Sequence, residues 1–101
     1  MRYLRLSEIA ERYGIGRDEL ETLAREELIE IKQTLDEEPV VSCDDVDKAR
    51  LAMVLMNELD VNLAGAEVIV HMREEMLAMQ RQFGRILETL IEEIRRVAAG
   101  R

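Results

Sequence analysis

Residues 6–27, LSEIAERYGIGRDELETLAREE, decide the fold of this chain. The first part has the apolar spacing of a short helix, with Ser7 placed to cap its start. The face that this helix would bury consists of Leu6, Ile9, Ala10 and Tyr13. Gly14 and Gly16 break the helix, and a second helix is predicted from about Arg17 to Glu26. Its buried side consists of Leu20, Leu23 and Ala24. Two short helices joined by a tight glycine turn form a helix-turn-helix motif.

A small β-hairpin and a third helix are predicted after this motif. Residues 28–41 contain branched side chains in partial alternation and a turn at Asp36–Pro39, which is typical of a hairpin, or wing. Ser42 is a good N-cap for the next helix, with Asp45 three residues further on, and this helix is expected to end near Leu59. Its predicted buried stripe consists of Val46, Ala49, Leu51, Met53, Val54 and Met56.

The last predicted helix is the longest, from about Leu63 to beyond Val97, with Asn62 as its expected cap. Its apolar residues repeat at intervals of three and four, which is the spacing of a coiled-coil seam. The seam predicted to form a homodimer consists of Ile69, Met72, Met76, Met79, Phe83, Ile86 and Leu90. Further apolar residues from Leu87 onward shift the heptad, so an antiparallel or bundle-like pairing stays as open as a parallel zipper. The stripe could also fold back on its own domain.

The net charge of −8 is concentrated in the first part of the chain. Residues 1–60 hold 16 acidic against 8 basic residues, whereas residues 61–101 hold 6 of each. We expect the first segment to be a winged helix-turn-helix domain and the second a long helix that packs on it and dimerises. Residues 18–47 contain 12 acidic and only two basic residues, a field that attracts cationic surfaces and repels nucleic acid. The simpler alternative is that acidic faces only keep the protein soluble.

The sequence contains no constellation that predicts catalysis or cofactor binding. Its one histidine and one cysteine, His71 and Cys43, lie on different predicted elements without the spacing of metal ligands. The acidic pairs Glu37-Glu38 and Asp44-Asp45 match no calcium loop, and no phosphate-binding glycine loop occurs. We therefore expect a non-enzymatic protein without a metal or cofactor. The lack of a secretory signal, a membrane-length apolar run and paired cysteines predicts a cytoplasmic location.

With these elements laid out, the chain resembles the MerR-type regulators over about residues 3–83. It resembles more closely an offshoot of them, the chaperone-modulator family of CbpM type. The most specific shared phrase is LDVNLAGAEVI, residues 59–69, which is similar to a turn-and-helix segment of these modulators and of the MerR-type heat-shock repressors. The resemblance implies a mainly α fold, a MerR-like winged helix-turn-helix with a small β-hairpin wing and a long C-terminal helix.

The modulators and the DNA-binding members separate at the positions that contact DNA. In this resemblance, DNA-binding members tend to carry an Arg-Tyr pair in the second helix and an Arg-Arg-Tyr-like run before the third. The corresponding residues here are Glu21-Thr22 and Pro39-Val40-Val41. A helix that lies in a DNA groove must neutralise phosphates and offer donors to base edges, and only Arg17 and Arg25 remain as cations in this one. We therefore do not expect tight DNA binding.

The resemblance implies a modulator that binds the J-domain of a DnaJ-like co-chaperone and prevents it from stimulating its Hsp70 partner. J-domains present a basic helix to Hsp70, so an acidic surface is suited to compete for that helix. The predicted partner-binding residues are Asp18, Glu19, Glu21, Glu26 and Glu27. High affinity would also need a buried apolar anchor, which the sequence does not locate.

Two alternatives stay open. The first is a MerR-type heat-shock transcriptional regulator that binds DNA as a dimer. Its DNA contacts would come from a basic partner or from Arg2, Arg5, Arg12 and Arg17. The second alternative is a plain oligomerisation module.

Overall fold

A computed structural model describes residues 2–100. In chain order the elements are β1 (Tyr3–Arg5), α1 (Leu6–Tyr13), α2 (Arg17–Arg25), β2 (Ile31–Gln33), β3 (Pro39–Ser42), α3 (Cys43–Glu58) and α4 (Leu63–Ala99). The chain divides into two compact units, of which the first ends at Val70 and the second begins at His71. The second unit consists mostly of the later part of α4. The fold is therefore mainly α, with the winged helix-turn-helix and long last helix that the sequence predicts.

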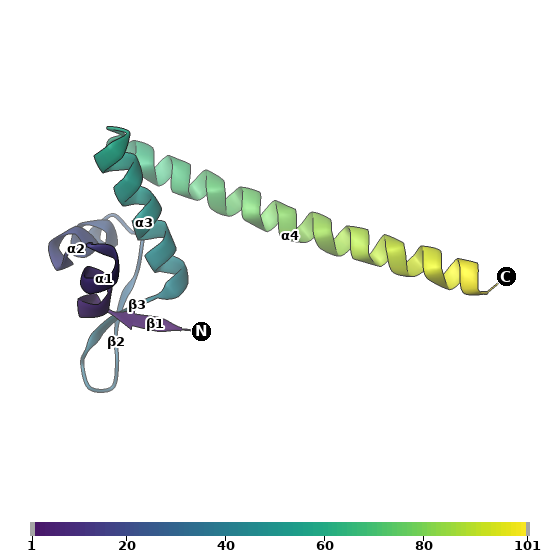
Figure 1. Ribbon diagram of the computed structural model, residues 1–101, viewed down its shortest axis with the longest axis horizontal. Helices are drawn as coiled ribbons and strands as arrows, with labels where there is room; N and C mark the ends of the chain where they lie inside the picture. The colour runs from purple at the N-terminus through teal and green to yellow at the C-terminus, as the bar shows by residue number, and fades with distance from the viewer. Residues whose placement is uncertain (1, 101) are drawn as a thin grey trace. The chain divides into compact units, whose positions relative to one another are not determined.

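A three-stranded antiparallel sheet lies at one end of the first unit, in the order β1-β3-β2 (Figure 1). The central strand β3 places Val41 opposite Leu4 of β1 and opposite Ile31 of β2. The predicted hairpin is confirmed as β2 and β3, but its first strand begins later than expected. Strand β1 was not predicted, because three residues that precede a helix carry too short a pattern to indicate pairing with a distant partner.

The start of α1 differs from the prediction. Strand β1 leads directly into this helix, so Arg5 is the N-cap residue and Ser7 lies exposed within the first turn. The Glu8 carboxylate accepts a hydrogen bond from the Arg5 backbone N–H at 3.2 Å. The predicted cap by Ser7 is therefore wrong. The helix begins at Leu6, so Ser7 lies inside it and cannot occupy the N-cap position.

The caps of the two later helices are confirmed. The Ser42 hydroxyl accepts a hydrogen bond from the Asp45 backbone N–H at 3.2 Å at the start of α3. The Asn62 side chain accepts one from the Gly65 N–H at 2.7 Å at the start of α4. A Cβ atom added at Gly65 would lie 2.8 Å from a methyl group of Val61, so this glycine permits a close approach in the turn before α4.

The core of the first unit joins both motif helices to the sheet and to α3. Its fully buried large side chains are Ile9, Leu20, Leu23 and Val41. The predicted stripe of α3 is partly wrong, because Ala52 and Leu55 are buried while Val54 is 43% exposed. Burial along α3 follows steps of three residues from Val46, and the small Ala49 and Ala52 lie within it. The prediction missed Ala52, whose small side chain is a weak signal of a buried face, and the larger Leu55, which lies one step of three residues further on.

Candidate functional site

Helix α2 positions the predicted partner-binding carboxylates. It buries Leu20 and Leu23 completely, which turns its opposite side toward solvent. Four of the five predicted residues are exposed and Glu21 is half-buried. The exposed four are Asp18, Glu19, Glu26 and Glu27. The structure thus brings all five residues onto or directly after one short helix, with a group at each end of it.

Two of the five carboxylates are engaged within the chain. Glu21 forms an ion pair with Arg17 at 3.0 Å, and the Glu19 carboxylate accepts a hydrogen bond from the Gly16 N–H at 3.4 Å. Within residues 2–100, the side chains of Asp18, Glu26 and Glu27 form no ion pair or hydrogen bond. These three carboxylates therefore leave uncompensated negative charge on the surface of α2 and its C-terminal end.

Glu27 occupies a position where helices usually place glycine. The Leu28 N–H donates to the Leu23 carbonyl at 2.9 Å and the Glu27 N–H donates to the Ala24 carbonyl at 3.0 Å, the two hydrogen bonds of a Schellman motif. This motif requires a left-handed residue, and Glu27 has a φ of 61°. A side chain with a Cβ is strained there, at a cost of about 1–2 kcal/mol. The sequence carries no signal of this strain, because no glycine marks the end of α2.

A hollow of about 570 Å³ opens beside Glu27, between the end of α2, the start of β2 and the first turns of α3. We call it the α2–β2 hollow. Its lining consists of Ala24, Glu27, Leu28, Ile29, Glu30, Ile31, Asp45 and Lys48. The Asp45 carboxylate accepts a hydrogen bond from the Glu30 N–H at 2.9 Å and lies 3.4 Å from the Lys48 ammonium. Sequence reasoning missed this site, since Glu30 and Asp45 meet only when the linker after α2 packs against α3.

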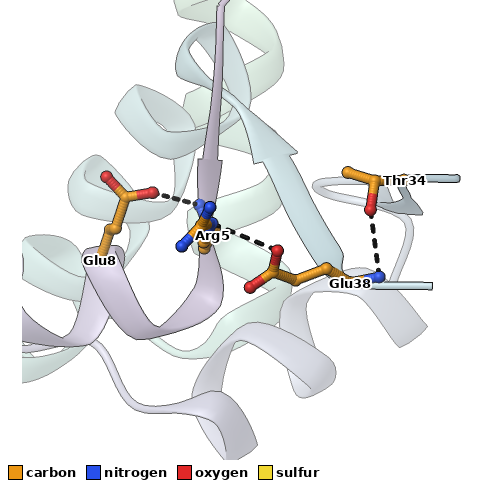
Figure 2. Close-up of polar contacts among 4 residues, drawn as sticks. All are labelled: Arg5, Glu8, Thr34 and Glu38. Atoms are coloured by element: carbon orange, nitrogen blue, oxygen red, sulfur yellow. Dashed lines mark hydrogen bonds and ion pairs between the residues drawn. The ribbon is translucent and has the colours of Figure 1, made fainter. Parts of the chain in front are cut away.

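Most arginines proposed as DNA contacts are matched by a carboxylate. Figure 2 shows Arg5 between Glu8, which accepts its backbone N–H, and Glu38, which lies 3.2 Å from its guanidinium. Arg12 lies 4.0 Å from Glu8, and Arg17 is paired with Glu21. Of the four candidates, only Arg2 forms no ion pair with the residues that the structure describes. Exposed pairs such as these add little stability, but they weaken the local positive potential that attracts a polyanion.

The wing carries acidic residues at its turn. Figure 2 shows the Thr34 hydroxyl accepting the Glu38 N–H, a hydrogen bond of 3.2 Å. The Thr34 carbonyl also accepts the Glu37 N–H at 2.9 Å. These hydrogen bonds close the turn. Leu35 is fully exposed in it, and the exposed charged residues Asp36 and Glu37 are acidic, so neither offers a cation to a nucleic acid. The wing therefore extends the acidic character of α2 rather than balancing it.

The predicted dimer seam on α4 consists of exposed apolar side chains. Exposure among its seven residues ranges from 38% at Ile69 to 68% at Met79. Beyond the seam, the apolar residues from Leu87 to Val97 are also between 44% and 66% exposed. Helix α4 therefore presents an exposed apolar stripe at coiled-coil spacing as far as Leu90, and further apolar residues widen it from Leu87 onward.

Across residues 2–100, no group of three or more His, Cys, Asp or Glu side chains is placed to hold a metal ion. The same residues contain no helix with the length and apolar composition that crossing a membrane requires.

The fold and its exposed second helix define a winged helix-turn-helix protein. The model of the MerR HTH family regulatory proteins matches this chain over residues 4–96, and the chain belongs to that family. The match covers the helix-turn-helix motif, the wing and most of α4. A search of the curated proteins finds no match.

Proposed function

We propose that this member of the MerR family is a non-enzymatic regulator that acts on a protein. In this proposal it binds the J-domain of a DnaJ-like co-chaperone and modulates the stimulation of Hsp70, as its resemblance to the CbpM-type modulators implies. One observation carries the proposal: the exposed side of α2 and its C-terminal end present unpaired carboxylates, Asp18, Glu26 and Glu27. Such a surface suits a cation-rich protein and opposes a phosphate backbone.

The charges of this surface act mainly on the rate and selectivity of association. An exposed ion pair contributes about 0–1 kcal/mol, so a few rim pairs do not make a tight complex. Complementary fields instead raise the association rate and disfavour partners of the wrong sign. Because the Debye length is about 8 Å at physiological ionic strength, this contribution should fall as salt rises.

The proposed regulator is a homodimer that pairs through the seam on α4. Seven large apolar side chains at heptad spacing are exposed on one helix, the kind of stripe that a second copy covers in a coiled coil. Burying one such side chain stabilises the dimer by about 1.5–3 kcal/mol. Several together therefore outweigh the free-energy cost of the translational and rotational freedom that two chains lose on association. A dimer would also carry two copies of the acidic surface.

A second candidate function is transcriptional regulation as a DNA-binding dimer of heat-shock type. Membership of the MerR HTH regulatory family favours it. The ion pairs of Arg5, Arg12 and Arg17 weigh against it, because a neighbouring carboxylate lowers the positive potential at three of the four arginines that would contact phosphates. A basic partner would have to supply those contacts.

The two candidates are separated by one binding experiment. The purified full chain is titrated with a J-domain fragment, and in parallel with duplex DNA, at a low and a high salt concentration. We expect the J-domain to bind, with lower affinity at high salt, and the duplex to bind weakly at both. Tight duplex binding together with no J-domain binding would overturn the proposal.

A further inference from the structure

We infer that the α2–β2 hollow is the anchor site of the acidic surface, and that it receives the side chain of a lysine or arginine from the basic partner. The inference rests on the proposed function, because it assumes a cationic protein partner, and it adds where that partner is held. It supplies the buried apolar contact that charge alone does not provide.

The floor of the hollow suits the aliphatic part of such a side chain. Ala24 and Ile31 are half-buried, while Leu28 and Ile29 are 7% and 5% exposed, so apolar atoms form its base. Lysine and arginine bury their methylene stems on apolar surface while the charged head stays near water or a carboxylate. With a volume of about 570 Å³, the hollow lies within the range of about 300–1,000 Å³ typical of binding pockets.

The rim of the hollow suits the charged head. Three carboxylates line it, those of Glu27, Glu30 and Asp45, against one ammonium, that of Lys48. Lys48 lies beside Asp45, and within the described residues the Glu27 and Glu30 side chains form no ion pair or hydrogen bond. The lining therefore keeps a net negative charge, which favours a cation and disfavours an anionic or purely apolar ligand.

The arrangement favours a protein side chain over a bare metal ion. The carboxylates of the rim do not form a cluster that could hold a metal, as found for all described residues. A second hollow of about 250 Å³ shares Glu30, Asp45 and Lys48 with the first, and its lining also includes Tyr3, Lys32, Ser42 and Asp44. The two hollows together form a concave surface larger than one bound side chain needs, which suits contact with a protein segment.

Two kinds of variant test the inference in the full chain. The double variant Glu27→Gln with Glu30→Gln removes the rim charges and keeps their shape. Its matched control, Glu11→Gln with Asp47→Asn, removes two exposed carboxylates that form no ion pair with described residues and lie outside the hollow. Ala24→Leu fills the floor without changing charge, and Ile31→Ala removes part of the floor as a second variant. Thermal unfolding of each variant verifies that it is folded.

Affinity is measured for a J-domain fragment and for a short synthetic Lys-rich amphipathic peptide, at a low and a high salt concentration. We expect the rim variant to weaken binding of both probes at least tenfold at low salt, and the control less than twofold. The loss in the rim variant should shrink at high salt, because screening removes a charge effect. The loss in Ala24→Leu should persist at high salt, because it removes an apolar contact.

The outcomes separate the hollow from the proposed function. If the J-domain binds the native chain and the rim and floor variants as tightly as the control, the hollow is not the anchor and the proposed function stands. If only the peptide binds and the rim and floor variants lose it, the hollow takes cationic side chains and the J-domain proposal fails. If neither probe binds the native chain, both are rejected.

Discussion

Replacing Glu27 with glycine is expected to stabilise the protein and to weaken its binding to a basic partner. The two effects have separate causes at one residue. The backbone at Glu27 has a φ of 61°, which glycine adopts freely and other residues adopt with strain. The carboxylate of the same residue lines the α2–β2 hollow. A single change thus removes both the strain and one charge of the proposed site.

The expected gain in stability follows from two opposing terms. Relief of the left-handed conformation contributes about 1–2 kcal/mol. The greater freedom of glycine in the unfolded chain takes back about 0.5–1 kcal/mol. The net gain is about 0.5–1 kcal/mol, which corresponds to a rise in Tm of about 2–8 °C for a domain of this size. The Schellman hydrogen bonds from Glu27 and Leu28 are made by backbone groups and should remain.

Tyrosine fluorescence is a suitable probe of this unfolding. Both tyrosines of the chain, Tyr3 and Tyr13, lie in the first unit, so their signal follows that unit rather than the later part of α4. Glu27→Ala is the matched control, because it removes the same carboxylate and keeps a Cβ at the strained position. Glu26→Gly is a second control at a neighbouring residue with a φ of −86°.

We expect the free energy of unfolding to rise in Glu27→Gly only, and to fall in Glu26→Gly because glycine loses more entropy there without relieving strain. J-domain affinity should fall equally in Glu27→Gly and Glu27→Ala, since both lack the carboxylate. If Glu27→Gly is no more stable than Glu27→Ala, the reasoning about the left-handed position is refuted.

Three further predictions concern α4 and the acidic surface. Gly65→Ala should lower stability by about 1–3 kcal/mol, because its methyl group would meet a valine side chain at 2.8 Å, whereas Gly84→Ala should increase helicity, because nothing lies within 4 Å. Thermal melts by circular dichroism compare the two, and a stable Gly65→Ala variant would disprove the close approach. Replacing Glu21 and Glu26 together with lysine should slow J-domain association in stopped-flow measurements while stability stays within about 1 kcal/mol; unchanged association kinetics would move the contact surface elsewhere. Phe83→Glu should convert the dimer to monomers in analytical ultracentrifugation, because it places a charge in the apolar seam; a monomeric native chain would contradict the seam itself.

Much of the fold could be predicted from local patterns. The glycine turn between the motif helices, the Ser42 cap and the Asn62 cap depend on residues close in sequence, and the structure contains each of them. The N-terminal strand and the start of α1 could not be predicted in this way. Their geometry depends on the pairing of Leu4 with Val41, which lies far along the chain.

The candidate site likewise has one part that the sequence predicts and one part that it does not. The acidity of α2 is a property of its own residues, and helical periodicity alone turns Leu20 and Leu23 inward and the carboxylates outward. The α2–β2 hollow is different, because its lining combines Glu27, which follows α2, with Asp45 of α3. No spacing in the sequence indicates that combination.

The sequence by itself determined which helices form, where α3 and α4 are capped and which face of α2 is acidic, because these features depend on contacts within a few residues. Only the tertiary structure decided that Glu38 pairs with Arg5 and where a hollow opens beside the strained Glu27, whereas Arg12 and Arg17 pair with carboxylates four residues away in their own helices. Glu38 reaches Arg5, and Asp45 reaches the backbone of Glu30, only after the wing has packed against β1 and α3. The charges and the ion pairs within a helix depend on the local sequence, whereas the ion pair between Arg5 and Glu38 and the hollow depend on long-range packing.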